Sequence, residues 1–345
     1  MAGGAGERFW PLSTKERPKQ LLKLIDADRS LIQMTVDRVL PLIPAERVFI
    51  ATNAVQAPAV IEELPYIPPG NVIIEPAFKD TAAAIGFASV VIESICPGSV
   101  MIVLASDHLI KDEESFRDVL SEAITIADRD SAIVTLGIKP SYPETGYGYL
   151  ETKEMIPGKA VKVERFCEKP ASDIALEYLK GGKHLWNSGM FIFKVSVMMD
   201  AFRRLMPNHA AAFDKIAALG EGMRDAQNPE LISIFNTFQK ISIDFGVMER
   251  FENTVVIPVD FGWSDIGSFP ALADVFTGNE NGSVVKGTEV NEISSSNNIV
   301  ISTTGKKISL LGVDDTVIVE TPENILICSK KEAQNIKKLL GNITI

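Results

Sequence analysis

Short apolar runs, rich in β-branched residues, alternate with longer amphipathic stretches over the first part of the chain. The apolar runs lie at 47–52, 71–75, 99–105 and 131–137. Their unbroken apolar character is typical of parallel strands that are buried on both faces. Helices are predicted between and around them, at 30–40, 55–63, 80–95 and 113–129. This alternation indicates βαβ units and therefore an α/β fold with a doubly wound, mostly parallel, Rossmann-like sheet.

The pattern becomes mixed between residues 140 and 267 and changes again near residue 283. In the mixed region, strands are predicted at 160–167 and 189–195, and helices at 171–180, 196–218 and 229–238. After residue 283, short strands are separated by Gly, Asn or Asp-Asp turns and are followed by one closing helix at 330–340. We therefore expect a large α/β domain over residues 1–280 and a small β-rich domain over residues 281–345.

Amino-acid composition limits the classes of protein to which this chain can belong. The chain has 345 residues, of which 46% are hydrophobic, so it can bury a core without disulfides or a structural metal. A formal net charge of -11 disfavours a nucleic-acid partner, which would need a basic face. Three cysteines lie far apart without a CxxC motif, and no apolar run is long enough to span a bilayer. We expect a cytoplasmic protein with reduced thiols and no membrane partner.

The first residues combine small, backbone-exposing positions with cations. Glycines let backbone N–H groups approach phosphate oxygens closely, because no Cβ blocks the way. The alternative is an ordinary turn beside a solvated basic patch. The stretch fits neither GxGxxG before a helix nor GxxxxGK[ST]. Its small residues are Ala2, Gly3, Gly4 and Gly6, and its cations are Arg8, Lys15, Arg17, Lys19 and Lys23.

This start resembles the GGxGxRxxPLT/S…KP signature of sugar-nucleotide pyrophosphorylases, and in particular that of mannose-1-phosphate guanylyltransferases. Further stretches resemble motifs of the same family in the same order, so the resemblance covers the whole region before the β-rich end. They are EPAFKDTAAAI (75–85), ASDH (105–108), ETGYGYL (144–150), FCEKP (166–170), WNSGMFIF (186–193), ISIDFGVME (241–249) and GWSDIGS (262–268). The family's fold, a nucleotidyltransferase sheet with a small β-rich C-terminal domain, agrees with the periodicity.

The chain departs from the family pattern at its start. In the family, an apolar first strand precedes the glycine-rich loop, and here Met1 stands at the last position of that strand. A sheet without a central strand would leave backbone groups unpaired and a core position empty. We therefore expect that a chain extended upstream would be more stable than this one. At the other end we expect no fused isomerase domain and a single activity.

The reaction that the resemblance implies joins GTP and mannose 1-phosphate to give GDP-mannose and pyrophosphate. Its nucleophile is a phosphate oxygen that is already anionic, so the chemistry needs cations and a hard metal ion rather than a general base. Asp107 and Asp265 each follow an apolar strand, where ligands of such sheets bind. We expect them to hold Mg²⁺, although each alone could be a turn or cap residue. His108 is expected to shape the site.

Arg8 and Lys19 are expected to clamp the triphosphate beside the glycine-rich loop, with Lys19 at the α-phosphate by resemblance to the family's KP lysine. Glu75 stands where related pyrimidine enzymes have a Gln before a Pro. A carboxylate accepts hydrogen bonds from both guanine N1–H and N2–H, which predicts Glu75 as the base reader. Asp80 either shares that role or caps the helix that starts at Thr81.

The sugar phosphate is assigned by resemblance to Glu168 and Asn187 as hydroxyl partners, Lys169 as phosphate partner and Gly146 as a point of close backbone approach. Asp265 belongs to the same site through the metal ion. Two alternatives stay open. The scaffold could use another hexose 1-phosphate, or the chain could be a non-catalytic paralogue that senses GDP-mannose. A homodimer that covers the edges of the C-terminal strands is also expected.

Overall fold

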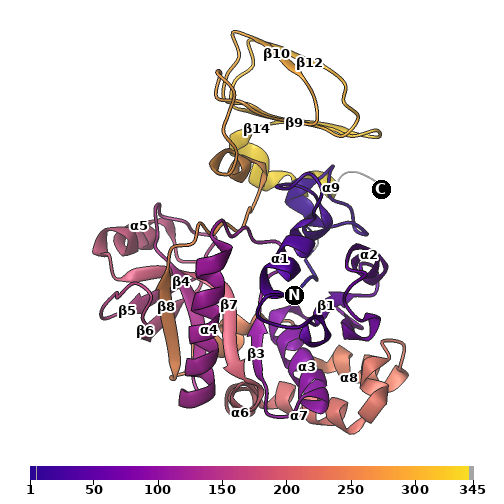
Figure 1. The fold of residues 1–345 in the computed structure, drawn as a ribbon, viewed down its shortest axis with the longest axis vertical. Coiled ribbons are helices and arrows are strands. Elements are labelled where there is room, and N and C mark those ends of the chain that lie inside the picture. Colours follow the sequence, from indigo (N-terminus) through magenta and orange to yellow (C-terminus); the bar gives the residue numbers. More distant parts are fainter. Residues whose placement is uncertain (5, 342–345) are drawn as a thin grey trace.

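The computed structural model describes residues 1–4 and 6–341, so the last four residues of the predicted C-terminal domain lie outside the described residues. An α/β body carries a β-rich part at one end (Figure 1). The body contains a six-stranded sheet in the order β3-β7-β4-β8-β6-β5. Its strands are β3 (Val100–Val103), β4 (Ile133–Ile138), β5 (Tyr149–Thr152), β6 (Val161–Cys167), β7 (His184–Lys194) and β8 (Thr254–Val259).

The six-stranded sheet is more mixed in direction than its apolar runs suggest. β4 and β8 are parallel, whereas β7 is antiparallel to both β3 and β4, and β6 is antiparallel to β5 and β8. A continuous apolar run shows that a strand is buried but not which way it runs, because either direction can be covered by helices. The α/β fold class itself is confirmed.

Two further strands, β1 (Ile50–Asn53) and β2 (Val72–Glu75), form a separate parallel pair. The first residues of the chain lie between β1 and β3 and bond to both sides. Met1 N donates to the Leu104 carbonyl (2.8 Å), and Ala2 N–H donates to the Ala51 carbonyl (2.7 Å). The glycine-rich loop therefore starts at the carboxyl ends of β1 and β3, where the sheet presents its ligand-binding edge.

Most helices begin and end close to their predicted bounds, with one correction. The single helix expected over 196–218 is two helices, because Pro207 disfavours a helical conformation at Met206 and starts a new helix. The helices are α1 (Leu31–Val39), α2 (Ala57–Glu63), α3 (Asp80–Ile95), α4 (Glu113–Asp130), α5 (Ser172–Gly181), α6 (Val195–Leu205), α7 (Pro207–Ala218) and α8 (Pro229–Thr237). A π-helical turn spans Asp244–Met248.

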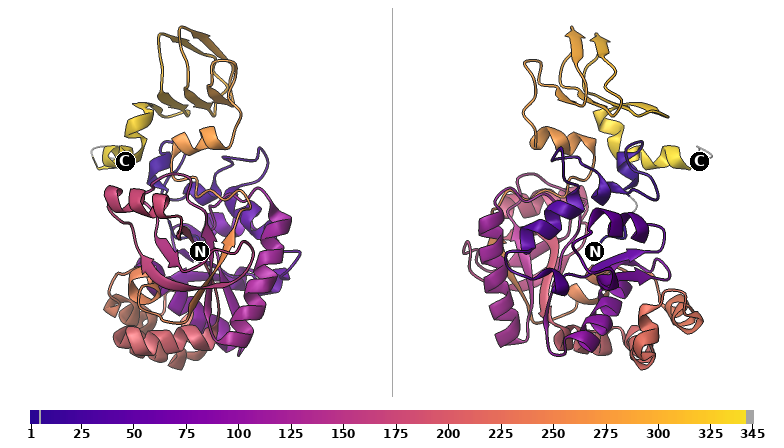
Figure 2. Two further views of the ribbon diagram at one scale, coloured as in Figure 1. Left: turned by 90° about the vertical axis from the view of Figure 1, so that its left-hand side faces the viewer. Right: turned by 45° about the vertical axis from the view of Figure 1, so that its right-hand side comes forward.

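Helices cover the sheet on both sides (Figure 2). Aromatic side chains of these helices make contacts beneath them. The α6 and α7 helices meet through Phe202 and Phe213, whose rings lie 5.0 Å apart in an edge-on arrangement. The α4 helix packs through Phe116 against Phe261, which follows β8, with 5.3 Å between ring centroids. Such buried aromatic pairs anchor the helices and so hold the strand ends in place.

The C-terminal part is built from parallel coils. β9, β11 and β13 form parallel ladders in one sheet that β14 closes in the antiparallel direction, and β10 pairs in parallel with β12. Matching side chains of successive coils, such as Ser296 and Asp314, are 18 residues apart and hydrogen-bonded. The strands are β9 (Val284–Lys286), β10 (Val290–Ile293), β11 (Ile299–Ser302), β12 (Ile308–Leu311), β13 (Thr316–Glu320) and β14 (Ile325–Ser329).

The closing helix expected over 330–340 is a 3-10 turn, Lys330–Asn335, followed by the short α9 helix, Lys337–Leu340. The C-terminal part shares an apolar core with the start of the chain. Phe9 lies 5.0 Å from Phe269, and the same buried cluster includes Val317 of β13. The segment that follows the glycine-rich loop is thus fixed between the body and the coils (Figure 1).

Further 3-10 turns lie at Glu7–Phe9, Lys19–Leu21, Ala45–Arg47, Pro69–Asn71, Gly220–Arg224 and Phe269–Asp274. All three cysteines are free thiols, as expected. Over the described residues, the search for a membrane-crossing helix finds none with the required length and apolar character.

Candidate active site

The glycine-rich loop is held by side chains from other segments. The Ala2 carbonyl accepts hydrogen bonds from Gln20 Nε2 (2.8 Å) and from the Thr52 hydroxyl (3.0 Å). Gln20 Nε2 also lies 3.3 Å from the Gly4 carbonyl. Because a buried glutamine holds two of its carbonyls, the loop has a fixed path before any ligand binds.

Gly6 brings this loop directly against Lys19. Its φ of +63° lies in the left-handed region, and a Cβ added there would stand 2.5 Å from the Lys19 backbone nitrogen. Any other residue at this position would therefore meet both backbone strain and a clash. The requirement for glycine at position 6 comes from the close approach of two backbone segments.

Lys19 lies at the centre of the predicted charges. Its Nζ donates to Asp107 Oδ2 (2.9 Å) and to the backbone carbonyl of Asp265 (2.5 Å), and only 7% of its side chain is exposed. Burial opposes ionisation of Asp107, but the Lys19 charge and the hydrogen bond from Lys19 help to outweigh it, and the Asp107 pKa is lowered. The structure thus brings together three residues that the sequence places far apart.

Asp265 and Arg8 lie next to each other at Gly267. A Cβ added at Gly267 would stand 3.1 Å from an Asp265 carboxylate oxygen and 3.6 Å from an Arg8 guanidinium nitrogen. The Tyr147 hydroxyl donates to Asp265 Oδ1 (2.6 Å), and burial followed by the Asp265 charge raises the pKa of Tyr147. Arg8 is exposed and also donates to Gln334 Oε1 (2.8 Å), so the C-terminal part helps to orient it.

His108 packs beside this cluster as a neutral ring. Burial is the main cause that lowers its pKa, and the Trp263 indole N–H donates to His108 Nδ1 at 3.2 Å. A ring nitrogen that accepts from an indole in an apolar setting is a packing and hydrogen-bonding group. This arrangement fits the shaping role expected for His108.

A cavity of about 350 Å³ lies beside the charged cluster, and several residues predicted to bind the nucleotide line it. Glu75 is buried in its wall, and a Cβ added at Gly3 would stand 3.9 Å from Glu75 Oε1. Burial, which is opposed by the nearby positive Met1 nitrogen and reinforced by the Asp80 charge, raises the pKa of Glu75 to about 7. The predicted lining residues are Gly3, Gly4, Glu75, Asp80 and Thr81.

Asp80 and Thr81 stand at the start of α3 and are partly used by the fold. Asp80 Oδ1 accepts the Thr81 N–H (2.8 Å), which is a local helix-start contact. The Thr81 hydroxyl accepts the Ile243 N–H (2.8 Å) and so ties α3 to the π-helical turn. Asp80 makes the contact of a helix-start residue and also lines the cavity. Its position is therefore compatible both with capping α3 and with sharing the base-reading role.

The amino-acid residues predicted to bind the sugar phosphate lie in two separate places. Asn187 on β7 lies beside Asp244, which lines the cavity, and its Oδ1 accepts from the Thr135 hydroxyl (3.2 Å) and from the Gly189 N–H (3.2 Å). Its amide nitrogen donates to Asp244 Oδ1 (3.1 Å). Because its oxygen is occupied by two donors, the Asn187 amide has a defined orientation.

Glu168 and Lys169 form an ion pair of 2.5 Å, in which the Glu168 side chain is buried and the Lys169 side chain is 58% exposed. Gly148 makes a close approach to this pair, since a Cβ there would stand 2.5 Å from Glu168 Oε2. Gly146 instead donates its N–H to Glu144 Oε1 (2.7 Å).

Asp244 and Tyr147 were not singled out from the sequence. Asp244 lines the cavity, and burial followed by the Glu168 charge raises its pKa to about 7. Both residues lie inside stretches that resemble family motifs, ISIDFGVME and ETGYGYL, and this is the signal that could have found them. Asp244 thus adds one carboxylate to those predicted for the site.

The described residues contain no group of three or more His, Cys, Asp or Glu side chains arranged to hold a metal ion. Lys19 Nζ bonds to the Asp107 carboxylate and to the Asp265 backbone carbonyl, and the Asp265 carboxylate accepts from the Tyr147 hydroxyl. Two carboxylate ligands suit Mg²⁺, which commonly keeps waters and takes its remaining oxygens from substrate phosphates. The donor chemistry therefore fits a magnesium ion that is completed by a bound nucleotide.

Two families match the chain. The family described as Nucleotidyl transferase matches residues 1–282, and the one described as MannoseP isomerase/GMP-like beta-helix domain matches residues 289–343. Mannose-1-phosphate guanylyltransferase 2 of Escherichia coli O157:H7 is 36% identical over 99% of this chain and 72% of its own length. Mannose-1-phosphate guanylyltransferase ManC of Salmonella typhimurium has the same identity and coverage.

A solved structure shares both domains. The crystal structure named as mannose-1-phosphate geranyltransferase from Thermus thermophilus superposes with a TM-score of 0.88 and 31% identity, covering 99% of this chain and 97% of the other. The agreement extends over the α/β body and the C-terminal coils. The chain belongs to the nucleotidyl transferase family and, within it, to the mannose-1-phosphate guanylyltransferases.

Proposed function

We propose that this chain transfers a guanylyl group from GTP to mannose 1-phosphate. A sugar-phosphate oxygen attacks the α-phosphorus, a new P–O bond forms, the bond between the α-phosphorus and the bridging oxygen breaks, and pyrophosphate leaves as GDP-mannose is formed. The nucleophile is already an anion, so no proton has to be removed. The chain must instead stabilise negative charge on both sides of the phosphorus.

The observation that carries this proposal is the position of Lys19 under the glycine-rich loop. Its ammonium lies between Asp107 and Asp265, and its stem is buried, so the charge is preorganised. A fixed cation costs no reorganisation when the charge develops at the α-phosphoryl group. Arg8, exposed beside Asp265, would meet the outer phosphates.

Asp107 and Asp265 are the residues that would hold Mg²⁺. When bound, the ion would neutralise phosphate oxygens and the departing pyrophosphate as a Lewis acid. Tyr147 keeps the Asp265 carboxylate in one orientation through its hydroxyl. Lys19 holds the Asp107 carboxylate in one orientation through its ammonium group.

Glu75 would read the guanine base. Its carboxylate is buried in the cavity wall beside Gly3, where an acceptor-only group satisfies both donors of the Watson–Crick edge. The loop residues Ala2, Gly3, Gly4 and Gly6 would leave room for the nucleotide, and Thr81 would support the same wall. Asp80 is placed at this wall as well.

The sugar phosphate would lie at the other end of the cavity. Asn187 and Asp244 offer a donor and an acceptor to its hydroxyls, and Glu168 offers a second acceptor. Lys169, largely exposed beside Glu168, would pair with the phosphate group. Gly148 allows the close packing at Glu168, while Gly146 shapes the neighbouring turn.

The test is pyrophosphate release from GTP and mannose 1-phosphate, with Mg²⁺ and then with EDTA. We expect release that needs both substrates and stops with the chelator. A panel with ATP, UTP and glucose 1-phosphate measures how strongly the chain discriminates between nucleotides and between sugar phosphates. Binding of GDP-mannose without any release would favour the sensing paralogue, and faster release with another hexose 1-phosphate would favour the other alternative.

Asp107→Asn and Asp265→Asn variants should each lose at least about a hundredfold in kcat. Asp128→Asn, an exposed carboxylate on α4 paired with Lys194, is the matched control and should retain full activity. Unchanged activity in both site variants would contradict the proposed metal ligands.

We also propose a cytoplasmic homodimer without a nucleic-acid or membrane partner. The net charge of -11 opposes binding to polyanions. The outer strands of the coils expose large apolar side chains, which a second copy could cover. They are Ile293 (66%), Leu311 (75%), Ile325 (66%) and Ile327 (67%). Light scattering of the chain and of a Leu311→Lys variant tests this, since a dimer through this surface should weaken in the variant.

A further inference from the structure

One aromatic ring in the wall of the nucleotide cavity lies open to solvent. Phe78 lines the cavity of about 350 Å³ and is 59% exposed. Phe191 lines the same cavity, but it is 2% exposed and its ring belongs to the core. A large apolar side chain that stays in water inside a cavity indicates a surface that a ligand covers.

The chain that carries Phe78 is held in place by its neighbours. Lys79 Nζ donates to the carbonyls of Asn236 and Phe238, at 3.1 Å each. The Lys79 carbonyl accepts the Ile241 N–H (3.4 Å). The ring of Phe78 therefore extends from a fixed backbone, and little conformational freedom is lost when a ligand packs against it.

A cation covers one face of the Phe78 ring. Lys240 Nζ lies 4.6 Å from the ring centroid, which is the geometry of a cation–π contact. The described residues that line the cavity include Phe78 but not Lys240, so the ammonium lies on the side of the ring that is turned away from the cavity. The other face of the ring is turned toward the cavity and is free to contact a ligand.

The open face of Phe78 and the buried carboxylate of Glu75 belong to one cavity wall. Glu75 ends β2, and Phe78 follows it by three residues. A nucleobase has a flat π face for stacking and a polar edge for hydrogen bonds. Glu75 is the acceptor proposed for the edge of guanine, and Phe78 supplies an aromatic surface for its face.

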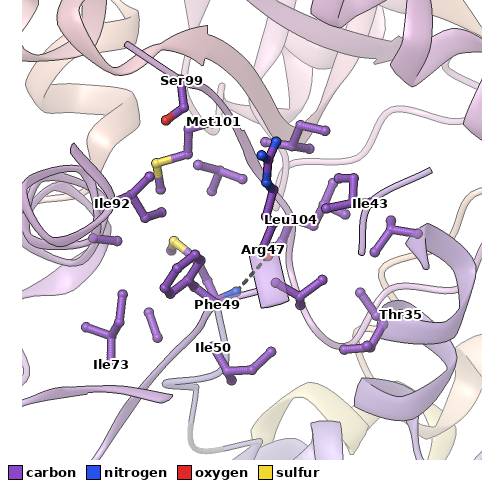
Figure 3. Close-up of a pocket in the computed structure, with 18 of the residues that line it drawn as sticks. Thr35, Ile43, Arg47, Phe49, Ile50, Ile73, Ile92, Ser99, Met101 and Leu104 are labelled. Atoms are coloured by element: carbon purple, nitrogen blue, oxygen red, sulfur yellow. Dashed lines mark hydrogen bonds between the residues drawn. The ribbon is translucent and has the colours of Figure 1, made fainter. Parts of the chain in front are cut away.

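The other large apolar cavity offers no comparable pair of groups (Figure 3). It measures about 390 Å³, and Ile50, Ile92 and Met101 are typical of its walls. It contains the ring of Phe49, but among the described residues that line it none is Asp or Glu. A guanine placed there would leave the donors of its edge without a charged acceptor.

We propose that Phe78 is the stacking platform for the base of the nucleotide, with Lys240 behind the ring. This inference rests on the proposed function, because it takes GTP as the nucleotide. Glu75 contacts the edge and selects guanine. Phe78 contacts the face, which every base has, and therefore determines the affinity for the nucleoside but not the choice between guanine and hypoxanthine.

Phe78→Leu tests the platform, because leucine keeps an apolar side chain and removes the π face. We expect KM for GTP and for ITP to rise about tenfold each, the scale of losing one base–aromatic stack. The inhibition constant of tripolyphosphate, which has no base, should change less than about twofold. Tyr66→Leu removes a ring that is 40% exposed and does not line the cavity, so it is the matched control.

Two outcomes of these kinetics would overturn the proposal. One is an unchanged KM for both nucleotides in Phe78→Leu. The other is an equal loss of affinity for GTP and for tripolyphosphate, which would place the effect at the phosphates. A loss for GTP that ITP does not share would also contradict stacking, because the two bases differ in an edge group and not in their rings.

Phe78→Trp provides a measurement that needs no turnover. Its indole adds emission to that of Trp10, Trp186 and Trp263, and a stacked base should quench the added part. We expect quenching by GTP and ITP and none by tripolyphosphate. Tyr66→Trp is the control and should show no more quenching than the original chain. Absence of quenching in Phe78→Trp, in a chain that releases pyrophosphate, would refute the stack alone. Quenching without any release would support the stack and contradict the guanylyl transfer.

Lys240→Met tests the position of the cation behind the ring. Because the ammonium is proposed to act through Phe78, the substitution should weaken GTP binding about threefold in the original chain and leave it unchanged in Phe78→Leu. An equal loss in both backgrounds would show that Lys240 acts on the nucleotide directly and would contradict its assigned place.

Discussion

Lys19 and Asp107 are 88 residues apart in the chain, yet Lys19 Nζ lies 2.9 Å from Asp107 Oδ2 and joins the glycine-rich loop to the end of β3. The same ammonium reaches the Asp265 carbonyl after β8. One buried cation thus gathers the ends of two strands and the loop into a single site. The fold has no need of a catalytic base here, because it supplies fixed charge where phosphate has to be held.

Lys19→Ala should lower kcat/KM by about a hundredfold or more, the scale of losing one preorganised charge contact. The variant also leaves the Asp107 carboxylate without its partner, so Tm should fall. Steady-state kinetics and thermal unfolding check both effects. Lys23→Ala, an exposed cation four residues along, is the matched control and should behave as the original chain. A Lys19→Ala enzyme with normal turnover would show that this ammonium has no role at the α-phosphate.

Glu75 should make GTP binding depend on pH. Its pKa is raised to about 7, so the carboxylate gains its charge as the pH rises through that value. Only the ionised form accepts from both guanine donors, so KM for GTP should fall about tenfold between about pH 6 and pH 8. In Glu75→Gln this slope should disappear, and GTP should lose more affinity than ITP, which lacks the N2 amine. The same slope in the variant would argue against Glu75 as the base reader.

Asp244→Asn should raise KM for mannose 1-phosphate about tenfold and change KM for GTP less than about twofold, because Asp244 bonds to Asn187, which we propose to contact the sugar. The thermal stability of the Asp244→Asn variant, unlike its affinity for the sugar phosphate, should increase. The folded-state pKa is raised to about 7, so the carboxylate destabilises the fold increasingly as pH rises from about 4 to 7. The variant should therefore gain Tm at pH 8. Asp200→Asn on α6 is the control, and equal effects on both substrates would exclude a sugar-specific role.

The sequence pattern was sufficient to predict helices, strands and strand-end residues where local signals and burial agree. The helix predicted over 80–95 is α3, Asp80–Ile95, and each of the four early strands overlaps its predicted run to within one residue at its carboxyl end. Asp107 and Asp265 could be placed near each other because both follow apolar strands, and the carboxyl ends of such strands share an edge. Lys19 could be added from the family motif, although its contact with both strand ends needed the structure.

What the pattern missed depends on tertiary contacts. The direction of β7 leaves no mark in its apolar run, since burial on both faces looks the same either way. Asp244 sits in a π-helical turn, which has no simple periodic signal. The packing of Gly148 against Glu168 is not evident from the letters TGYGY. Each of these features is decided by residues that are distant in sequence.

Gly6→Ala should reduce both stability and activity, because its φ of +63° and the Lys19 nitrogen 2.5 Å from an added Cβ leave no room for a side chain. Backbone strain at such a position costs about 1–3 kcal/mol, which corresponds to a fall in Tm of several degrees. The displaced backbone also moves Lys19, so kcat should drop together with Tm. Gly4→Ala is the matched control for Tm, since a Cβ there has no atom within 4 Å. If both variants unfolded at the same temperature and Gly6→Ala kept full turnover, the contact between the loop and Lys19 would have no part in organising the site.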